Sequence, residues 1–162
     1  MSAPDGPILI AFDGSAAARQ AVTDAAWFAQ PRRAIVLTVW DAAVGYAMVS
    51  PSPDVTMGSA VDPGTVLVMD HELSRRADRI AGEGADLARS LGLDAEPLAM
   101  ADGGDIASTI LRVAREHNAS AIVVGSRGLN GLRARLEGST SKAVLKHASC
   151  PVLIVHEHGD HD

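Results

Sequence analysis

Glycine and hydroxyl side chains are concentrated in one stretch near the carboxyl end of the chain. Two short runs, 125–128 (GSRG) and 138–141 (GSTS), are separated by nine residues, and a helix is predicted over 139–148. Glycine lets backbone N–H groups approach an anion because it has no Cβ. The first turn of a helix adds unpaired N–H groups and the positive end of the helix dipole. The pattern predicts a phosphate-binding loop, whereas a single Gly-Ser pair would indicate only a connector with Ser139 as N-cap.

The charge around this loop differs from the charge of the whole chain. Residues 125–147 hold five Lys or Arg and one Glu, although the net charge of the protein is −6. A small positive region on an acidic body fits a small anion better than a long polyanion. We therefore expect no nucleic-acid binding; on charge alone, a solvated helix face is the alternative interpretation.

Asp13 is the second candidate functional feature of the sequence. It ends the apolar run 7–12 (PILIAF) and begins an Asp-Gly-Ser turn, in which Ser15 is a candidate N-cap. Asp-Gly is also a common turn pair, so a purely structural role is the alternative. The nearby glycine loop favours a ligand role for Asp13.

The elements that must position these residues alternate along the chain. Strands are predicted at 7–12, 34–40, 95–100, 121–124 and 151–155, and helices at 16–29, 65–91, 105–117 and 139–148. This alternation predicts an α/β fold with one parallel sheet. We expect a single domain over 1–162, with a long loop at 41–64 and a flexible tail at 156–162.

Ligands of open parallel sheets bind beyond the carboxyl ends of the strands, where the winding direction reverses. The first and fourth predicted strands would flank that point, and Asp13 and Gly125 end them. Other phosphate and nucleophile motifs are missing from the sequence: G-x-G-x-x-G after the first strand, G-x-x-x-x-G-K-[ST], and G-x-S-x-G. A dinucleotide fold, a P-loop NTPase and a serine hydrolase are therefore not expected.

The pattern G-x2-G-x9-G-S, filled by Gly125, Gly128, Gly138 and Ser139, resembles the motif of the ATP-binding branch of the universal stress protein family. The segments ILIAFDGS, AIVVGSRGLNGL and GSTSKAVLKHASCPVLIV are similar to that family too, whereas 41–95 matches only in outline. The resemblance implies a five-stranded parallel sheet in the order 3-2-1-4-5 with helices on both faces. Such a fold is Rossmann-like, of the adenine nucleotide alpha hydrolase-like type.

The same resemblance implies how a nucleotide binds. Adenine would lie along the backbone of Val39, Asp13 would face the ribose or a phosphate-bound metal, and Gly125 would lie by the ribose. The residues around the phosphates would be Arg127, Gly128, Gly138, Ser139 and Ser141. Thr140 stands where the family often has an apolar residue, and its backbone N–H would still serve. The expected cofactor is ATP with Mg²⁺.

The family commonly dimerises through its last strand, here 151–155, so we expect a homodimer that covers this sheet edge. Cys150 is the single cysteine, which excludes an intramolecular disulfide, and its place before the last strand indicates a small buried hydrophobe. The His- and Asp-rich tail, 156–162, rarely fixes a geometry for a metal, and none is expected. An acidic amino terminus and the absence of a membrane-spanning apolar run predict a cytoplasmic protein that is not bound to a membrane.

A predicted phosphate site without an evident catalytic base favours a nucleotide-binding stress-response protein that signals to a protein partner and is not an enzyme. One alternative is a slow ATPase, in which Asp13 and Mg²⁺ polarise the γ-phosphate. The other alternative is a protein-interaction module that no longer depends on nucleotide.

Overall fold

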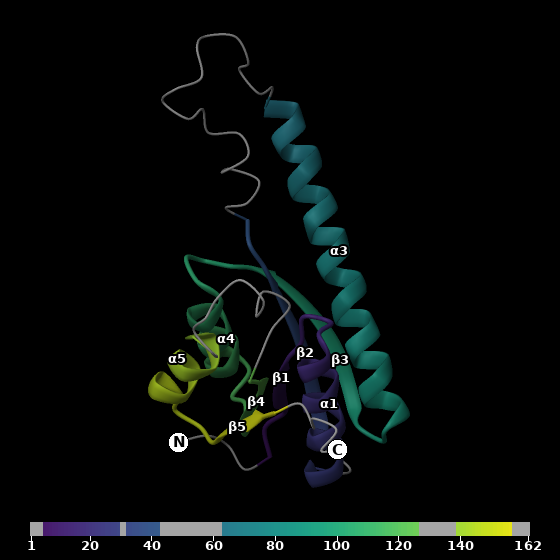
Figure 1. The fold of residues 1–162 in the computed structure, drawn as a ribbon, viewed down its shortest axis with the longest axis vertical. Helices are drawn as coiled ribbons and strands as arrows, with labels where there is room; N and C mark the ends of the chain where they lie inside the picture. Colours follow the sequence, from purple (N-terminus) through teal and green to yellow (C-terminus); the bar gives the residue numbers. More distant parts are fainter. Residues whose placement is uncertain (1–4, 30–31, 43–62, 127–138, 157–162) are drawn as a thin grey trace, which may run out of the picture.

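The computed structural model describes residues 5–29, 32–42, 63–126 and 139–156, and the statements below concern these ranges. Five parallel strands form one sheet in the order β3-β2-β1-β4-β5 (Figure 1). They are β1 (Ile8–Ala11), β2 (Arg33–Trp40), β3 (Asp94–Ala101), β4 (Ala121–Gly125) and β5 (Val152–Val155). The parallel sheet and the strand order implied by the resemblance are confirmed.

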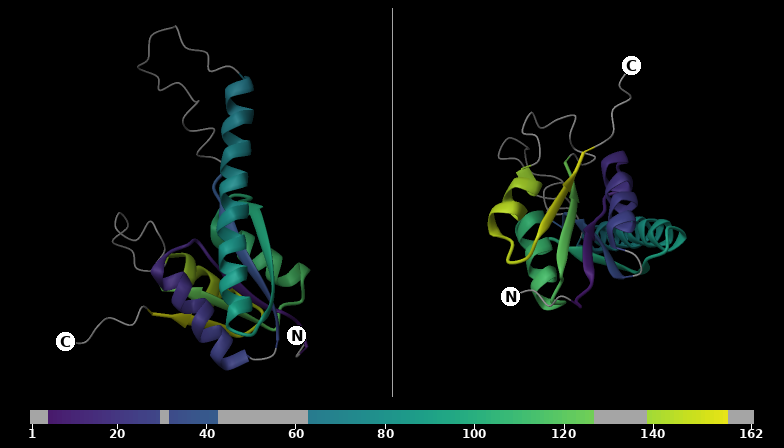
Figure 2. Two further views of the ribbon diagram at one scale, coloured as in Figure 1. Left: turned by 90° about the vertical axis from the view of Figure 1, so that its right-hand side faces the viewer. Right: turned by 90° about the horizontal axis from the view of Figure 1, so that it is seen from below.

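Four helices cover the two faces of the sheet. They are α1 (Ala16–Ala29), α3 (Pro63–Ser90), α4 (Ile106–Glu116) and α5 (Ser139–His147). Seen from below in Figure 2, α1 and α3 lie on one face and α4 and α5 on the other. The expected three-layer α/β arrangement is therefore present.

Each face of the sheet has its own core, and the side chains of β1 alternate between them. Ile8 and Ile10 belong to the cluster under α1 and α3, whereas Leu9 belongs to the cluster under α4 and α5. A strand that is buried on both faces carries apolar residues continuously, which explains the unbroken run at 7–12.

The structure corrects the carboxyl-terminal limit of the predicted long loop at 41–64, because α3 already begins at Pro63. Proline suits the first turn of a helix, since the N–H that it lacks would have no partner inside the helix. The rest of that loop, 43–62, and the tail from residue 157 onward lie outside the described residues.

Helix α3 is the longest helix in the described part of the chain, and it is continuous through Gly82 and Gly84. A Cβ on Gly84 would lie 2.7 Å from Cδ1 of Phe12 and 2.8 Å from Cγ1 of Val36. A Cβ on Gly82 would have nothing within 4 Å. Gly84 therefore allows α3 to lie close against β2 and against Phe12, which follows β1, whereas Gly82 faces open space.

These two glycines provide a matched pair of variants. We expect Gly82→Ala to raise the free energy of unfolding by about 0.5–1 kcal/mol, because alanine favours the helix. We expect Gly84→Ala to lower it by about 1–2 kcal/mol, because the added methyl group overpacks the contact with Phe12. Urea unfolding of both proteins measures the difference, and shifts in the same direction would contradict the packing argument.

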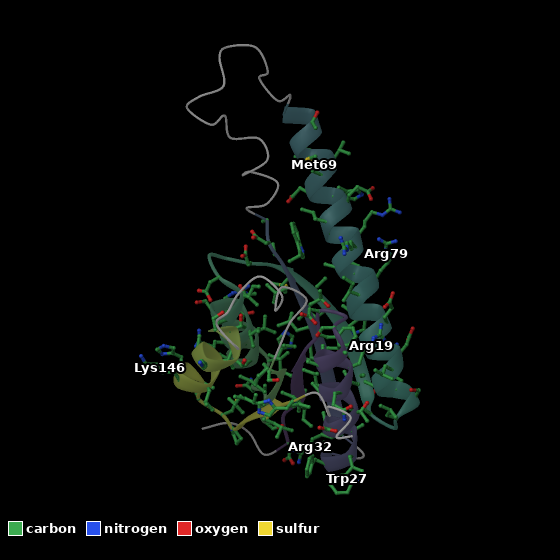
Figure 3. The ribbon with its side chains drawn as sticks, viewed as in Figure 1. Arg19, Trp27, Arg32, Met69, Arg79 and Lys146 are labelled. Carbon is green, nitrogen blue, oxygen red and sulfur yellow. The ribbon has the colours of Figure 1, made fainter. Side chains whose placement is uncertain are left out.

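The amino-terminal part of α3 extends beyond the sheet (Figure 1), and Met69 lies near its far end in Figure 3. Leu67 is 71% exposed and Val68 is 63% exposed there. The part of α3 from Ala77 to Ala88 is the part with buried residues, and it packs on β2 and β3. The contacts of α3 with Phe12 and Val36 come from this second part of the helix.

Candidate functional site

The carboxyl ends of β1, β2 and β4 lie side by side. Strand β1 pairs with β2 on one side and with β4 on the other, and the register places Ile10 opposite both Val36 and Val123. In chain order, β2 and then β3 are added on one side of β1, and β4 and then β5 are added on its other side. The prediction that β1 and β4 flank the switch point is confirmed, and Asp13 and Gly125 both lie at this edge.

Asp13 lies in a tight turn between β1 and α1. Gly14 has a φ of +81°, which only glycine adopts readily, and the backbone N–H of Ser15 donates to Oδ1 of Asp13 at 2.9 Å. The backbone N–H of Ala18 donates to Oγ of Ser15 at 3.1 Å, as expected of an N-cap. The half-buried Asp13 carboxylate is thus oriented beside the amino terminus of α1.

Two hydrogen bonds tie the residue before Asp13 to β2. The backbone N–H of Phe12 donates to the carbonyl oxygen of Leu37 at 2.8 Å, and the hydroxyl of Thr38 donates to the carbonyl oxygen of Phe12 at 2.8 Å. Thr38 is buried, and Val39 follows it directly. These bonds fix the Asp13 turn relative to the end of β2. Our sequence analysis missed Thr38, although a hydroxyl inside the apolar run AIVLTVW was the available signal.

Gly125, the last residue of β4, is packed against α1. A Cβ at this position would lie 3.0 Å from the carbonyl carbon and 3.1 Å from the carbonyl oxygen of Ala17. The next residue, Ser126, donates its backbone N–H to the carbonyl oxygen of Val155 at 2.7 Å. The structure thus adds a packing reason for glycine at 125, besides the approach of an anion that the sequence predicts.

Helix α5 begins at Ser139, as predicted. Ser139 is exposed, Thr140 is half-buried and Ser141 is buried. Four residues separate the end of this helix at His147 from the start of β5 at Val152, so the amino terminus of α5 lies toward the carboxyl edge of the sheet. The first turn of α5 is therefore directed to the same edge as Asp13, Val39 and Gly125. Three predicted site residues, Arg127, Gly128 and Gly138, lie outside the described residues.

Cys150 is half-buried against the core under α4 and α5, and burial raises the pKa of its thiol, which favours the unreactive protonated form. The described ranges contain no group of three or more His, Cys, Asp or Glu side chains that could hold a metal ion. Within the same ranges, no helix combines the length and the apolar character needed to cross a bilayer.

This architecture defines a Rossmann-like α/β domain with a candidate ligand site at its switch point. Residues 6–156 match the sequence model of the Universal stress protein family. The chain belongs to the universal stress protein family.

Relatives of similar length support this assignment. Universal stress protein YxiE of Bacillus subtilis is 32% identical over 155 residues, covering 91% of this chain and 97% of that protein. The structure of universal stress protein UspA from Lactobacillus plantarum is similar in fold, with a TM-score of 0.69 and 24% identity over 94% of this chain and 99% of the other.

Two further solved structures of similar fold contain adenine nucleotides. One is a universal stress protein in complex with cAMP, with a TM-score of 0.61 and 23% identity, covering 96% of this chain and 99% of that one. The other is the universal stress protein from Archaeoglobus fulgidus in complex with dAMP, with a TM-score of 0.56 and 20% identity, covering 94% and 99%. At these identities, the likeness establishes the fold alone.

Proposed function

We propose that this universal stress protein binds an adenine nucleotide, with ATP and Mg²⁺ as the expected ligand, at the carboxyl edge of β1, β2 and β4. One observation carries the proposal: the Asp13 turn and Gly125 end adjacent strands at the switch point, and the first turn of α5 is directed to the same edge. That arrangement combines a carboxylate with a helix amino terminus at the place where open parallel sheets bind ligands.

In the proposed complex, the adenine lies along the backbone of Val39 and Asp13 binds the ribose or the Mg²⁺ ion, with Gly125 beside the ribose. The phosphates are bound by residues 127–128 and 138–141. Ser139 and Ser141 lie in the first turn of α5. The cAMP and dAMP complexes of similar folds support the adenine and ribose part of this proposal. The proposal that the ligand carries further phosphates, as ATP does, depends on the G-x2-G-x9-G-S pattern of the sequence.

We also propose that the protein is a cytoplasmic homodimer whose nucleotide state is read by a protein partner in a stress response. Strand β5 is an edge strand with β4 as its described neighbour, and Leu153 on it is 36% exposed. Pairing with a second copy would cover this edge. The proposed role is binding without catalysis, because the predicted phosphate site has no evident catalytic base in its sequence pattern.

The alternative is slow ATP hydrolysis, favoured by a carboxylate at the position where a phosphate-bound Mg²⁺ would lie. A single-turnover assay with excess protein distinguishes the two. We expect no ADP above the background of the buffer, whereas ADP that appears with wild-type protein and not with Asp13→Asn would favour the ATPase.

Isothermal titration of the nucleotide-free protein with Mg-ATP tests the proposed site. We expect Asp13→Asn to weaken binding about tenfold or more, because a charge-assisted contact to the ribose or the metal is lost. Asp24→Asn is the matched control, since Asp24 lies further along α1 and accepts a hydrogen bond from Gln20.

Equal weakening by both substitutions would mean that only net charge matters, and unchanged binding by Asp13→Asn would remove Asp13 from the site. Absence of binding for ATP, ADP, AMP and cAMP alike would overturn the proposed function in favour of a nucleotide-independent interaction module.

A further inference from the structure

One face of α3 contacts the segment that carries Asp13. Ile80, Glu83 and Gly84 have the spacing that places residues on the same side of a helix. Cγ2 of Ile80 lies 3.8 Å from the place where a Cβ on Gly14 would stand, and Gly84 lies directly against the ring of Phe12. Helix α3 therefore packs on the residue immediately before Asp13, and Ile80 lies close to Gly14, the residue immediately after it.

A third contact joins α3 to the helix that follows the turn. Nη2 of Arg19 lies 3.5 Å from Oε2 of Glu83, and Arg19 lies between α1 and α3 in Figure 3. The guanidinium group of Arg19 also lies over the ring of Phe12, 5.8 Å from its centroid. The ion pair is exposed and contributes little by itself. Phe12, in contrast, is 2% exposed, and its ring lies next to Gly84 of α3 and to the guanidinium group of Arg19 on α1.

A close-packed contact of this kind transmits displacement. The backbone of Phe12 is hydrogen-bonded to β2 on both sides, by its N–H to Leu37 and by its carbonyl oxygen to Thr38. The ring is in turn covered by Gly84, where even one methyl group would be too close. Since interiors at this density do not yield freely, a shift of α3 presses on the ring, and through it on the backbone that leads into the turn at Asp13.

We propose that the Ile80–Gly84 face of α3 positions the Asp13 turn and thereby sets the nucleotide affinity of the site. Ile80 and Gly84 are positioning residues that act through Gly14 and Phe12 and touch no nucleotide. This inference rests on the proposed function for its ligand. Because linkage is reciprocal, nucleotide binding must tighten the docking of α3 by the same factor by which α3 docking strengthens nucleotide binding.

The first test compares Gly84→Ala with Gly82→Ala, which makes the same change on the same helix at a site with no neighbours. In the nucleotide-free proteins, we expect Gly84→Ala to shift the amide NMR resonances of Gly14 and Ser15, and Gly82→Ala to leave them in place. By calorimetry, we expect Gly84→Ala to weaken Mg-ATP binding roughly two- to thirtyfold, the range for substitutions that modulate the coupling to a site without touching its ligand. Gly82→Ala should bind as the wild type does.

A suppressor distinguishes positioning from loss of stability. Phe12→Leu in the Gly84→Ala background removes ring atoms at the overpacked contact, so we expect it to restore part of the affinity. Leu93→Ala creates a cavity at the opposite, amino-terminal edge of the sheet, where Leu93 is buried. It should lower stability while leaving nucleotide affinity unchanged. If Gly84→Ala does not fold, Ile80→Ala removes the Cγ2 atom that lies on the side of Gly14, with the same expected direction.

Hydrogen exchange measures the reciprocal effect. We expect Mg-ATP to slow exchange of the α3 amides at 77–88 in the wild type, and to slow it less in Gly84→Ala. A folded Gly84→Ala protein with wild-type resonances at Gly14 and Ser15 and wild-type affinity would overturn the inference. A wild-type protein that binds no nucleotide would overturn the proposed function and the affinity part of the inference, while the resonances of Gly14 and Ser15 still decide whether α3 positions the turn.

Discussion

Addition of 1 mM Mg-ATP is expected to raise the free energy of unfolding of this protein by about 2.7 kcal/mol if the dissociation constant is about 10 μM. A ligand that binds the folded state and not the unfolded chain stabilises the protein by this mass-action effect. The measurement is urea or thermal unfolding with and without Mg-ATP, after the purified protein has been tested for nucleotide carried over from expression.

The variant Gly138→Ala is expected to lose this stabilisation, because the proposed phosphate-binding pattern uses glycine at this position to let backbone N–H groups approach an anion. Gly82→Ala provides the control, since it makes the same substitution where a Cβ has nothing within 4 Å. A Gly138→Ala protein that is stabilised as much as the wild type would contradict the role of the glycine loop. Mg-GTP in place of Mg-ATP tests whether the base is recognised, and an equal shift would contradict adenine binding at Val39.

The second large effect is expected at Thr38. Replacement by valine keeps the shape of the side chain and removes the hydroxyl that donates to the carbonyl oxygen of Phe12 at 2.8 Å. Because both groups are buried, we expect Thr38→Val to lower the free energy of unfolding by about 1–3 kcal/mol, the cost of taking a donor from a buried acceptor. Urea unfolding without nucleotide measures it.

Thr38→Ser separates the hydrogen bond from packing, since serine keeps the hydroxyl and lacks one methyl group. Loss of one buried methyl group costs about 0.8 kcal/mol by transfer alone. We therefore expect the serine variant to be more stable than the valine variant. The reverse order would show that packing at this position outweighs the hydrogen bond to Phe12.

Much of the fold could be predicted from local patterns. Helix α1 was predicted at 16–29 and is observed at Ala16–Ala29, because Ser15 caps it and alanines recur at helical spacing. The apolar run at 34–40 became β2, which begins one residue earlier at Arg33. The limits of α3 were less accurate, since composition around Pro63 and Gly64 resembles that of a loop, whereas proline is also accepted in a first helical turn.

The candidate site could be predicted for residues that are chemically distinctive and also follow directly on a predicted strand. Asp13 and Gly125 end two apolar runs, and the rule for switch points brings those ends together. The residues that hold the turn in place were not predictable in this way. Thr38 and Gly84 lie 26 and 72 positions away from Phe12, and each looks ordinary within its own segment.

The sequence by itself determined the order of helices and strands, the apolar faces that build the two cores, and the residue types at the carboxyl edge. These properties depend on side-chain chemistry and on periods of two and 3.6 residues, which are local. Only the tertiary structure decided that α3 lies against the Asp13 turn through Ile80 and Gly84, and that Gly125 packs on α1. Such contacts depend on how closely two distant backbones approach, a distance that no local pattern encodes.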